Sequence, residues 1–384
     1  MPLFVTYWET TMIRKTVLAT ALATAAAVPG LASAQAAAPT LEKVLEASGL
    51  SLSGYIDAGY THANRNVETG GFSTRVFDSQ NNSFALHQVG VQIAKQPKEG
   101  FGGVVNVTAG SHALVIHSFD TTSESQFDVT QAFGQYASGS MTLMAGKFVT
   151  LQGTEVIWSP ANPNFSRSIL FGAIPFTHTG VRSVWAFSDK FSFTAGLNNG
   201  WDQVKDSNSG KTLELGTTLT PIKPLTIAAS YYTGKETVPQ ATPGNPEGKR
   251  TSLNAVATYT VSDPLTLGAE ILSVSQENFV SLVTGSPIKA KYSGQAFYVT
   301  YMIAPKWRAA GRLESFKDDD GFRFGTAGTK YKEFTATGAY LPNASFELRA
   351  ELRRDNADNA VFVETGGAAS KTLMTYALQA LYKF

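Results

Sequence analysis

Hydrophobic and polar positions alternate along most of this chain, from about residue 51 to its last residue. Each alternating stretch runs for about a dozen residues and is followed by a connection. In residues 345–353, Phe346, Leu348, Ala350 and Leu352 alternate with Ser345, Glu347, Arg349, Glu351 and Arg353. A period of two places the two sets on opposite faces of a β-strand. The pattern therefore predicts an all-β fold.

The connections between these stretches alternate strictly between short and long. Short ones carry Pro, Asp, Ser and Asn, which are typical of tight turns, and lie at 96–100, 138–140, 188–190, 221–224, 262–264, 304–306 and 342–344. Long ones are rich in Gly, Asn, Asp and Ser and lie near 63–82, 113–125, 153–175, 202–210, 237–248, 277–290, 318–328 and 357–370. Seven short and eight long connections join sixteen strands.

This alternation of connections distinguishes a membrane barrel from a globular β-sandwich. In an outer-membrane barrel the short turns face the periplasm and the long loops face outside. The apolar side chains must face lipid, because hydrocarbon does not solvate charges, and the polar ones face a wet interior. We expect one antiparallel, up-and-down transmembrane β-barrel over residues 51–384. If the strands have been divided too finely, twelve or fourteen remain and the pore is narrower.

The first 34 residues have the layout of a secretory signal peptide. A basic start at Arg14-Lys15 precedes an apolar stretch, and Ala32-Ser33-Ala34 supplies a small-x-small cleavage pattern. The apolar stretch is shorter than the roughly 20 residues that a spanning helix needs. We expect residues 1–34 to be removed on export, with Met12 as a possible true start. Residues 35–50 then form a short periplasmic lead-in, which suits an amphipathic helix over 39–50.

Composition excludes several classes of function. The chain has no cysteine, so no disulfide or thiolate metal site is available, and its 5 histidines show no metal-ligand spacing. Lys and Arg number 31 against 30 Asp and Glu, without a basic patch or tail for nucleic acid. Mean hydropathy is −0.07, as expected where lipid-facing and water-facing residues alternate. We predict no metal, no cofactor and no nucleic-acid partner.

A barrel of sixteen strands is wide enough for an aqueous channel, whereas eight strands are filled by side chains. The longest connection, 153–175, is the third long one, and its only charges are Glu155 and Arg167. In general porins the third external loop folds into the lumen and constricts it. We therefore expect Glu155 and Arg167 to lie at a constriction that screens solutes by charge and size. A loop that caps the rim is the alternative.

The polar faces of the strands carry charges of both signs, which we expect to line the pore. The candidates are Arg182, Glu214, Arg250, Glu270, Arg308, Arg312, Glu314, Glu347, Arg349, Glu351 and Arg353. Many of these charges are expected to pair with neighbours across strands. Such a balanced lumen predicts a mild ion preference.

The last residues alternate as well and end in Phe384, with Tyr382 two positions earlier. A final Phe after an amphipathic strand resembles the signal that the outer-membrane barrel-assembly machinery recognises. We therefore take Tyr382 and Phe384 as candidates for an assembly signal.

Several strings in the chain resemble one known family. They are GKFVTLQGTEVI at 146–157, NPNFSRSILFG at 162–172, IPFTHTGVR at 174–182, NGWD at 199–202, SGYIDAGY at 53–60 and LYKF at 381–384. Together they resemble the OmpL-like β-barrel porins of Gram-negative bacteria, over essentially the whole mature chain. The resemblance implies an outer-membrane porin and leaves the permeant open.

The expected function is a water-filled outer-membrane channel for passive diffusion of small hydrophilic solutes or ions. Outer-membrane lipid and lipopolysaccharide are the expected surroundings, and a homotrimer follows from analogy with other sixteen-stranded porins. A plugged or structural barrel, serving adhesion or envelope integrity, is the first alternative, and an enzyme on the barrel rim is the second. No nucleophile or base with an oriented partner is evident in the sequence, so we predict no enzymatic activity.

Overall fold

The computed structural model describes residues 40–67, 72–117, 125–237 and 247–384, which form a short helical unit and a β-barrel unit. The helix α1 (Leu41–Ser48) begins after Thr40, whose Oγ1 accepts the N–H of Lys43 at 3.4 Å. It ends at Gly49, whose φ of 67° is readily adopted by glycine. The predicted signal peptide lies outside the described residues. None of the described helices is long and apolar enough to cross a membrane.

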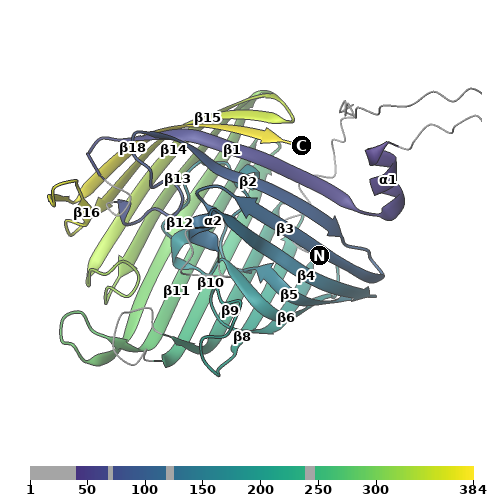
Figure 1. The fold of residues 1–384 in the computed structure, drawn as a ribbon, viewed down its shortest axis with the longest axis horizontal. Coiled ribbons are helices and arrows are strands. Elements are labelled where there is room, and N and C mark those ends of the chain that lie inside the picture. Colours follow the sequence, from purple (N-terminus) through teal and green to yellow (C-terminus); the bar gives the residue numbers. More distant parts are fainter. Residues whose placement is uncertain (1–39, 68–71, 118–124, 238–246) are drawn as a thin grey trace, which may run out of the picture. The chain divides into compact units, whose positions relative to one another are not determined.

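Sixteen antiparallel strands close the barrel, the number that the sequence predicts (Figure 1). In order around the barrel they are β1 (Ser51–Ala63), β18 (Thr372–Lys383), β15 (Phe346–Ala357), β14 (Thr329–Asn343), β13 (Trp307–Asp318), β12 (Pro287–Ala304), β11 (Leu265–Val280), β10 (Glu247–Ser262), β9 (Leu225–Thr237), β8 (Thr212–Ile222), β7 (Phe191–Asn198), β6 (Thr177–Ala186), β5 (Met141–Val149), β4 (Phe127–Ser138), β3 (Gly100–Ala109) and β2 (Ser83–Lys95). Pairing of β18 with β1 leaves no open sheet edge.

The connections follow the predicted alternation. Short turns join β2 to β3, β4 to β5, β6 to β7, β8 to β9, β10 to β11, β12 to β13 and β14 to β15. The loop predicted at 277–290 is shorter than expected, because the pairing of β11 with β12 continues to Val280 and Pro287. The last long loop contains a small hairpin of β16 (Phe362–Val363) and β17 (Ala369–Ser370). In Figure 1 this hairpin lies at the opposite end of the barrel from the C-terminus.

Within the described residues, the long connections contain three short helices with complete bounds. The helix α2 (Ala113–Ile116) lies between β3 and β4. The 3-10 helices η2 (Ser159–Ala161) and η3 (Phe171–Ala173) both belong to the connection between β5 and β6. We call that connection, residues 150–176, L3.

The two faces of the strands differ as the alternation predicts. On β15, Glu347, Arg349, Glu351 and Arg353 face the interior and are at most 6% exposed, whereas Leu348 faces outward and is 43% exposed. On β10, Leu253, Tyr259 and Val261 are exposed on the outer face. The barrel is therefore apolar outside and largely polar inside.

One part of the interior departs from the prediction of a polar inner face. Leu272 and Val274 of β11, and Phe316 of β13, face inward and belong to a buried apolar cluster. Ile169 and Leu170 of L3 belong to the same cluster. The expectation of a wholly polar inner face is wrong here, because a connecting loop folds inside the barrel and covers these side chains.

Candidate functional site: the loop inside the barrel

L3 runs through the barrel interior and contacts the inner wall on several sides. At its start, the backbone N–H of Leu151 donates to the hydroxyl of Tyr232 on β9 at 2.9 Å. Further along, the N–H of Gly153 donates to Asn254 Oδ1 on β10 at 3.0 Å. These two bonds attach the first residues after β5 to the inner faces of β9 and β10.

The far side of L3 reaches the first two strands. Ser159 Oγ donates to Gln88 Oε1 on β2 at 2.9 Å, and the Ser159 N–H approaches the hydroxyl of Tyr55 on β1 at 3.4 Å. The ring of Trp158 packs edge-on against Tyr55, with centroids 4.4 Å apart. L3 therefore extends across the interior from β9 to β1.

Carboxylates of the wall bind pairs of backbone N–H groups in L3. Glu351 on β15 accepts the N–H of Phe165 at 2.7 Å and of Ser166 at 2.9 Å. Glu314 on β13 accepts the N–H of Ile169 at 2.8 Å and of Leu170 at 3.1 Å. Glu270 on β11 accepts one backbone N–H of L3, from Thr154, at 2.9 Å. A buried N–H without such an acceptor is costly, so each carboxylate stabilises one backbone conformation of the loop.

Arginines of the same wall bind carbonyl groups of L3. The four bonds run from Arg308 to Pro163 at 3.2 Å, from Arg349 to Asn164 at 3.1 Å, from Arg312 to Ser166 at 2.9 Å and from Arg353 to Arg167 at 2.5 Å. Between residues 163 and 170, most backbone polar groups of L3 are thus bound by a charged side chain of β13 or β15. The predicted pore-lining charges on these strands hold the loop in place.

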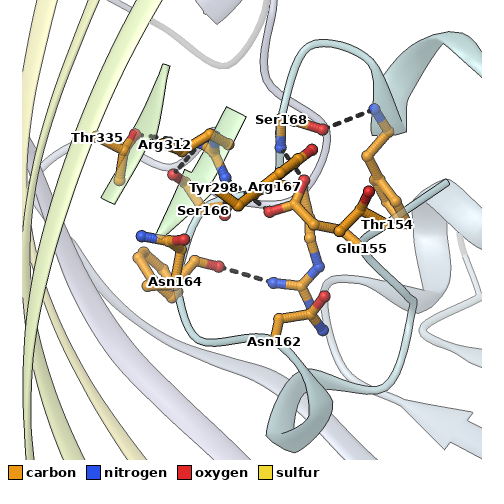
Figure 2. Close-up of polar contacts among 12 residues, drawn as sticks. Thr154, Glu155, Asn162, Asn164, Ser166, Arg167, Ser168, Tyr298, Arg312 and Thr335 are labelled. Carbon is orange, nitrogen blue, oxygen red and sulfur yellow. Dashed lines mark hydrogen bonds and ion pairs between the residues drawn. The ribbon is translucent and has the colours of Figure 1, made fainter. Parts of the chain in front are cut away.

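Glu155, one of the two predicted constriction residues, is buried at the junction of L3 and the wall. Its Oε2 accepts the N–H of Ser168 at 2.6 Å, and its Oε1 is 2.7 Å from Nη1 of Arg312. Arg312 also lies 3.1 Å from Glu333 and 3.5 Å from Glu314. One guanidinium therefore compensates three carboxylates. Figure 2 shows Arg312 and Thr335 of the wall beside Glu155 and Ser166 of the loop.

Arg167, the other predicted constriction residue, holds L3 together from within. Its guanidinium donates to the carbonyls of Val156 at 3.0 Å and Phe165 at 2.9 Å. It also lies over the rings of Phe77 and Phe171, at 5.5 and 5.8 Å from their centroids. Glu155 and Arg167 both belong to the loop that crosses the lumen, and the structure does not bring them into a direct ion pair with each other.

The remaining wall candidates pair within the wall. Arg182 on β6 binds Glu214 on β8 through two hydrogen bonds of 2.5 and 2.8 Å. These side chains meet across Gly196 of β7, where a Cβ atom would lie only 3.0 Å from Glu214. Arg250 on β10 donates to Gln276 at 2.7 Å. Glu347 accepts from Arg349 at 2.6 Å and also from Arg308.

The predicted pore-lining residues do not include several charged residues that the structure places in the interior. Glu333 and Asp355 hold Arg353, and Asp355 also binds Arg75 of the first long loop at 2.7 Å. Lys147, on the poorly alternating strand β5, pairs with Asp128 at 3.1 Å. Glu333 and Asp355 occupy inward positions of alternating strands, which was a signal that could have found them. Arg75 lies in a loop and had no such signal.

The junction between L3 and β6 depends on an acidic residue of a neighbouring loop. Asp202 Oδ1 accepts the N–H groups of Phe176 at 2.7 Å and Thr177 at 2.9 Å. Burial raises the pKa of this carboxyl to about 6, although the two N–H donors act in the opposite direction. Among the described residues, no group of three His, Asp or Glu side chains could hold a metal ion.

The candidate assembly residues lie at the seam where the barrel closes. Phe384 exchanges two backbone hydrogen bonds with Gly54 of β1, at 2.8 and 2.9 Å. The rings of Tyr382 and Phe384 lie 6.1 Å apart and are exposed on the outer face. Their role in assembly stays a prediction.

Comparison with known sequences identifies relatives of the whole barrel. A profile of the family described as "Putative beta-barrel porin-2, OmpL-like" matches residues 49–384. No curated protein sequence matches the chain.

Solved structures resemble the barrel at low sequence identity. The outer membrane channel DcaP of Acinetobacter baumannii is 15% identical, with a TM-score of 0.60, over 87% of this chain and 97% of that one. The anion-selective porin from Comamonas acidovorans is 9% identical, with a TM-score of 0.57, over 87% and 99%. OmpT of Vibrio cholerae in its trimer form is 12% identical, with a TM-score of 0.58, over 87% and 99%. These similarities establish a shared fold.

Proposed function

This chain belongs to the OmpL-like β-barrel porin-2 family, and we propose that it passes small hydrophilic solutes or ions through the outer membrane by passive diffusion. The observation that carries this proposal is a closed barrel of sixteen strands with an apolar outer face and a largely polar inner face. Barrels of this strand number leave an aqueous lumen. The short turns then lie in the periplasm, and the long loops lie outside.

L3 forms the constriction in this proposal. Its backbone is bound along residues 163–170 by charges of β13 and β15, so that it narrows the lumen without moving freely. Glu155 and Arg167 act there by fixing the shape of the loop.

A plugged barrel is the second candidate, and the burial of the inner wall favours it. At the level of L3, Glu214, Asn254 and Arg312 are each at most 2% exposed. An apolar cluster fills the space between L3 and β11–β14. In this alternative the barrel serves adhesion or envelope integrity and conducts no ions.

Single-channel recording in a planar bilayer separates the two candidates. The refolded mature chain, checked for the heat-modifiable mobility of a folded barrel, should give stable ohmic steps. A folded barrel that gives no steps would establish the plug. The reversal potential in a salt gradient would then report the charge preference of an open lumen.

The surroundings of the channel complete the proposal. We propose outer-membrane lipid and lipopolysaccharide as the contacts of the outer face, and the barrel-assembly machinery as the partner that reads Tyr382 and Phe384. A homotrimer is supported by the fold shared with OmpT of Vibrio cholerae, which is described in a trimer form. Membership of a porin family indicates a channel and no catalytic activity.

A further inference from the structure

Three cations gather on the periplasmic side of L3 around a single carboxylate. Arg308 and Arg349 both pair with Glu347, the latter at 2.6 Å, and Lys383 Nζ lies 3.8 Å from the same carboxylate. Glu347 is the second residue of β15 and Arg308 the second residue of β13, so the group lies at the short-turn end of the wall. We call Arg308, Arg349 and Lys383 the basic cluster. Arg308 and Arg349 share the one carboxylate of Glu347.

The pairing of β13, β14 and β15 places Arg308 and Arg349 on either side of the same residue, with both side chains on the inner face. Arg308 pairs with Ala339 of β14, and Ala339 pairs with Arg349 of β15. The small Ala339 side chain between them is 1% exposed and leaves room for both arginines above it. Both arginines also donate to L3, to the carbonyls of Pro163 and Asn164.

Two guanidinium nitrogens of the cluster have no hydrogen-bond partner among the described residues. They are Nε of Arg308 and Nη2 of Arg349, and both atoms are buried. The Arg349 residue as a whole is 2% exposed. A buried charged donor without an acceptor is rare and calls for an unseen partner such as water or an ion. Guanidinium groups match the planar oxygens of carboxylates and phosphates.

Two side chains of the cluster are partly exposed at this end of the wall. The side chains of Arg308 and Lys383 are 14% and 16% exposed, whereas that of Glu347 is 1% exposed. A solute that approaches from this side therefore meets positive charge before it meets the carboxylate.

We propose that the basic cluster binds a small oxyanion, a carboxylate or phosphate group, on the periplasmic face of L3. The bound group accepts hydrogen bonds from Arg308 Nε and Arg349 Nη2 and interacts with the ammonium of Lys383. The cluster thereby favours anionic solutes at the constriction, a consequence that rests on the proposed channel function. The same arginines donate to the carbonyls of Pro163 and Asn164, so binding of the oxyanion should also change the position of L3.

The first test measures binding without conduction. Inorganic phosphate, acetate and chloride are added at equal ionic strength to the folded barrel in detergent, and its thermal unfolding is followed. A ligand that binds only the folded state raises the unfolding temperature. Phosphate, acetate or both should raise it more than chloride does, and the more effective one identifies the preferred group. Equal effects of the three salts would overturn the site.

Variants separate binding from a structural role. The double variant Arg308→Gln/Lys383→Gln should weaken oxyanion binding by about tenfold or more, since charge-assisted hydrogen bonds are lost. The control Arg65→Gln changes a part-exposed arginine that pairs with Glu364 in the long loops, and should bind as the native protein does. Glu347→Gln removes the competing carboxylate and should bind more tightly. Weaker binding in Glu347→Gln would indicate that these variants only loosen L3, which contradicts the proposal.

Conductance distinguishes failure of the site from failure of the channel. In a bilayer, phosphate or acetate should reduce the chloride current of the native protein, and should reduce it less in Arg308→Gln/Lys383→Gln. A barrel that binds oxyanions but does not conduct would refute the channel and leave the site standing. A barrel that conducts with neither oxyanion binding nor block would refute the site and leave the channel standing.

Discussion

The two sides of the barrel use inward charges in different ways. On β10–β15, where strands reach 18 residues, carboxylates and arginines bind the backbone of L3. On β4–β8, where strands have 8 to 12 residues, the inward charges pair with each other, as in Arg182 with Glu214 and Lys147 with Asp128. The same alternating sequence pattern therefore serves a loop-holding wall and a self-paired wall. The difference lies in what faces each wall across the lumen.

Removal of the central cation of each wall should have the largest effect. Arg312→Met leaves Glu155, Glu314 and Glu333 without their shared cation, and should lower the free energy of unfolding by about 3–5 kcal/mol. Lys147→Met leaves one carboxylate, Asp128, and should cost less. Urea unfolding of both variants, followed by heat-modifiable mobility, measures the difference. Equal losses would show that the two walls are energetically alike.

Neutralising the carboxylates that bind L3 should come next. Glu351→Gln places an amide group where two N–H donors of L3 need an acceptor, and should cost about 1–3 kcal/mol. The loosened loop should widen the constriction, so the single-channel conductance should rise. Glu236→Gln is the matched control, because Glu236 binds Thr212 and Trp201 and not L3. A rise in both variants would argue against a specific role of Glu351 in holding the loop.

A smaller effect is expected where Gly196 separates Arg182 from Glu214. Gly196→Ala brings a Cβ atom to 2.9 Å from the carbonyl oxygen of Val181 and 3.0 Å from Glu214, and should cost about 1–2 kcal/mol. Gly338→Ala on β14 meets nothing within 4 Å and should be neutral or slightly stabilising. The urea midpoints of the two variants measure the difference in stability. Equal midpoints would show that the wall around Gly196 repacks to accept the added methyl group.

The smallest effect should be a pH dependence from Asp202. Its pKa of about 6 lies above the value near 3.8 expected in the unfolded chain, so the folded state binds more protons between these values. The free energy of unfolding should therefore fall as pH rises from 4 to 7. The Asp202 side chain is only partly buried, so solvent screens its charge and the fall should be only about 1 kcal/mol. Asp202→Asn keeps an acceptor for Phe176 and Thr177 and should remove this contribution. An unchanged pH profile in Asp202→Asn would assign the titration to another group.

Much of the fold follows from local sequence, because strands and tight turns depend on neighbouring residues. The alternation in 345–353 predicts that Leu348 faces away from Glu347 and Arg349, and in the structure Leu348 is exposed whereas the other two are buried. The strand count follows from the connections in the same way. These features need no knowledge of distant contacts.

The interior was harder to predict, because its contacts join residues far apart in the chain. Glu351 and Phe165 are 186 positions apart, and no local pattern marks them as partners. Leu272 and Phe316 break the rule of a polar inner face because Leu170 of L3 lies in the same buried cluster. The sequence pattern predicts which wall positions carry charges. It does not predict that many of these charges bind the backbone of L3.

The seam between Gly54 and Phe384 has a consequence for how the protein is made. The first strand finds its second partner only in the final residues of the chain. A nascent chain that lacks β18 has two unpaired sheet edges, and such edges invite pairing with other chains. Strands β1 and β15 therefore each lack a partner until β18 is in place, and closure of the barrel depends on that strand.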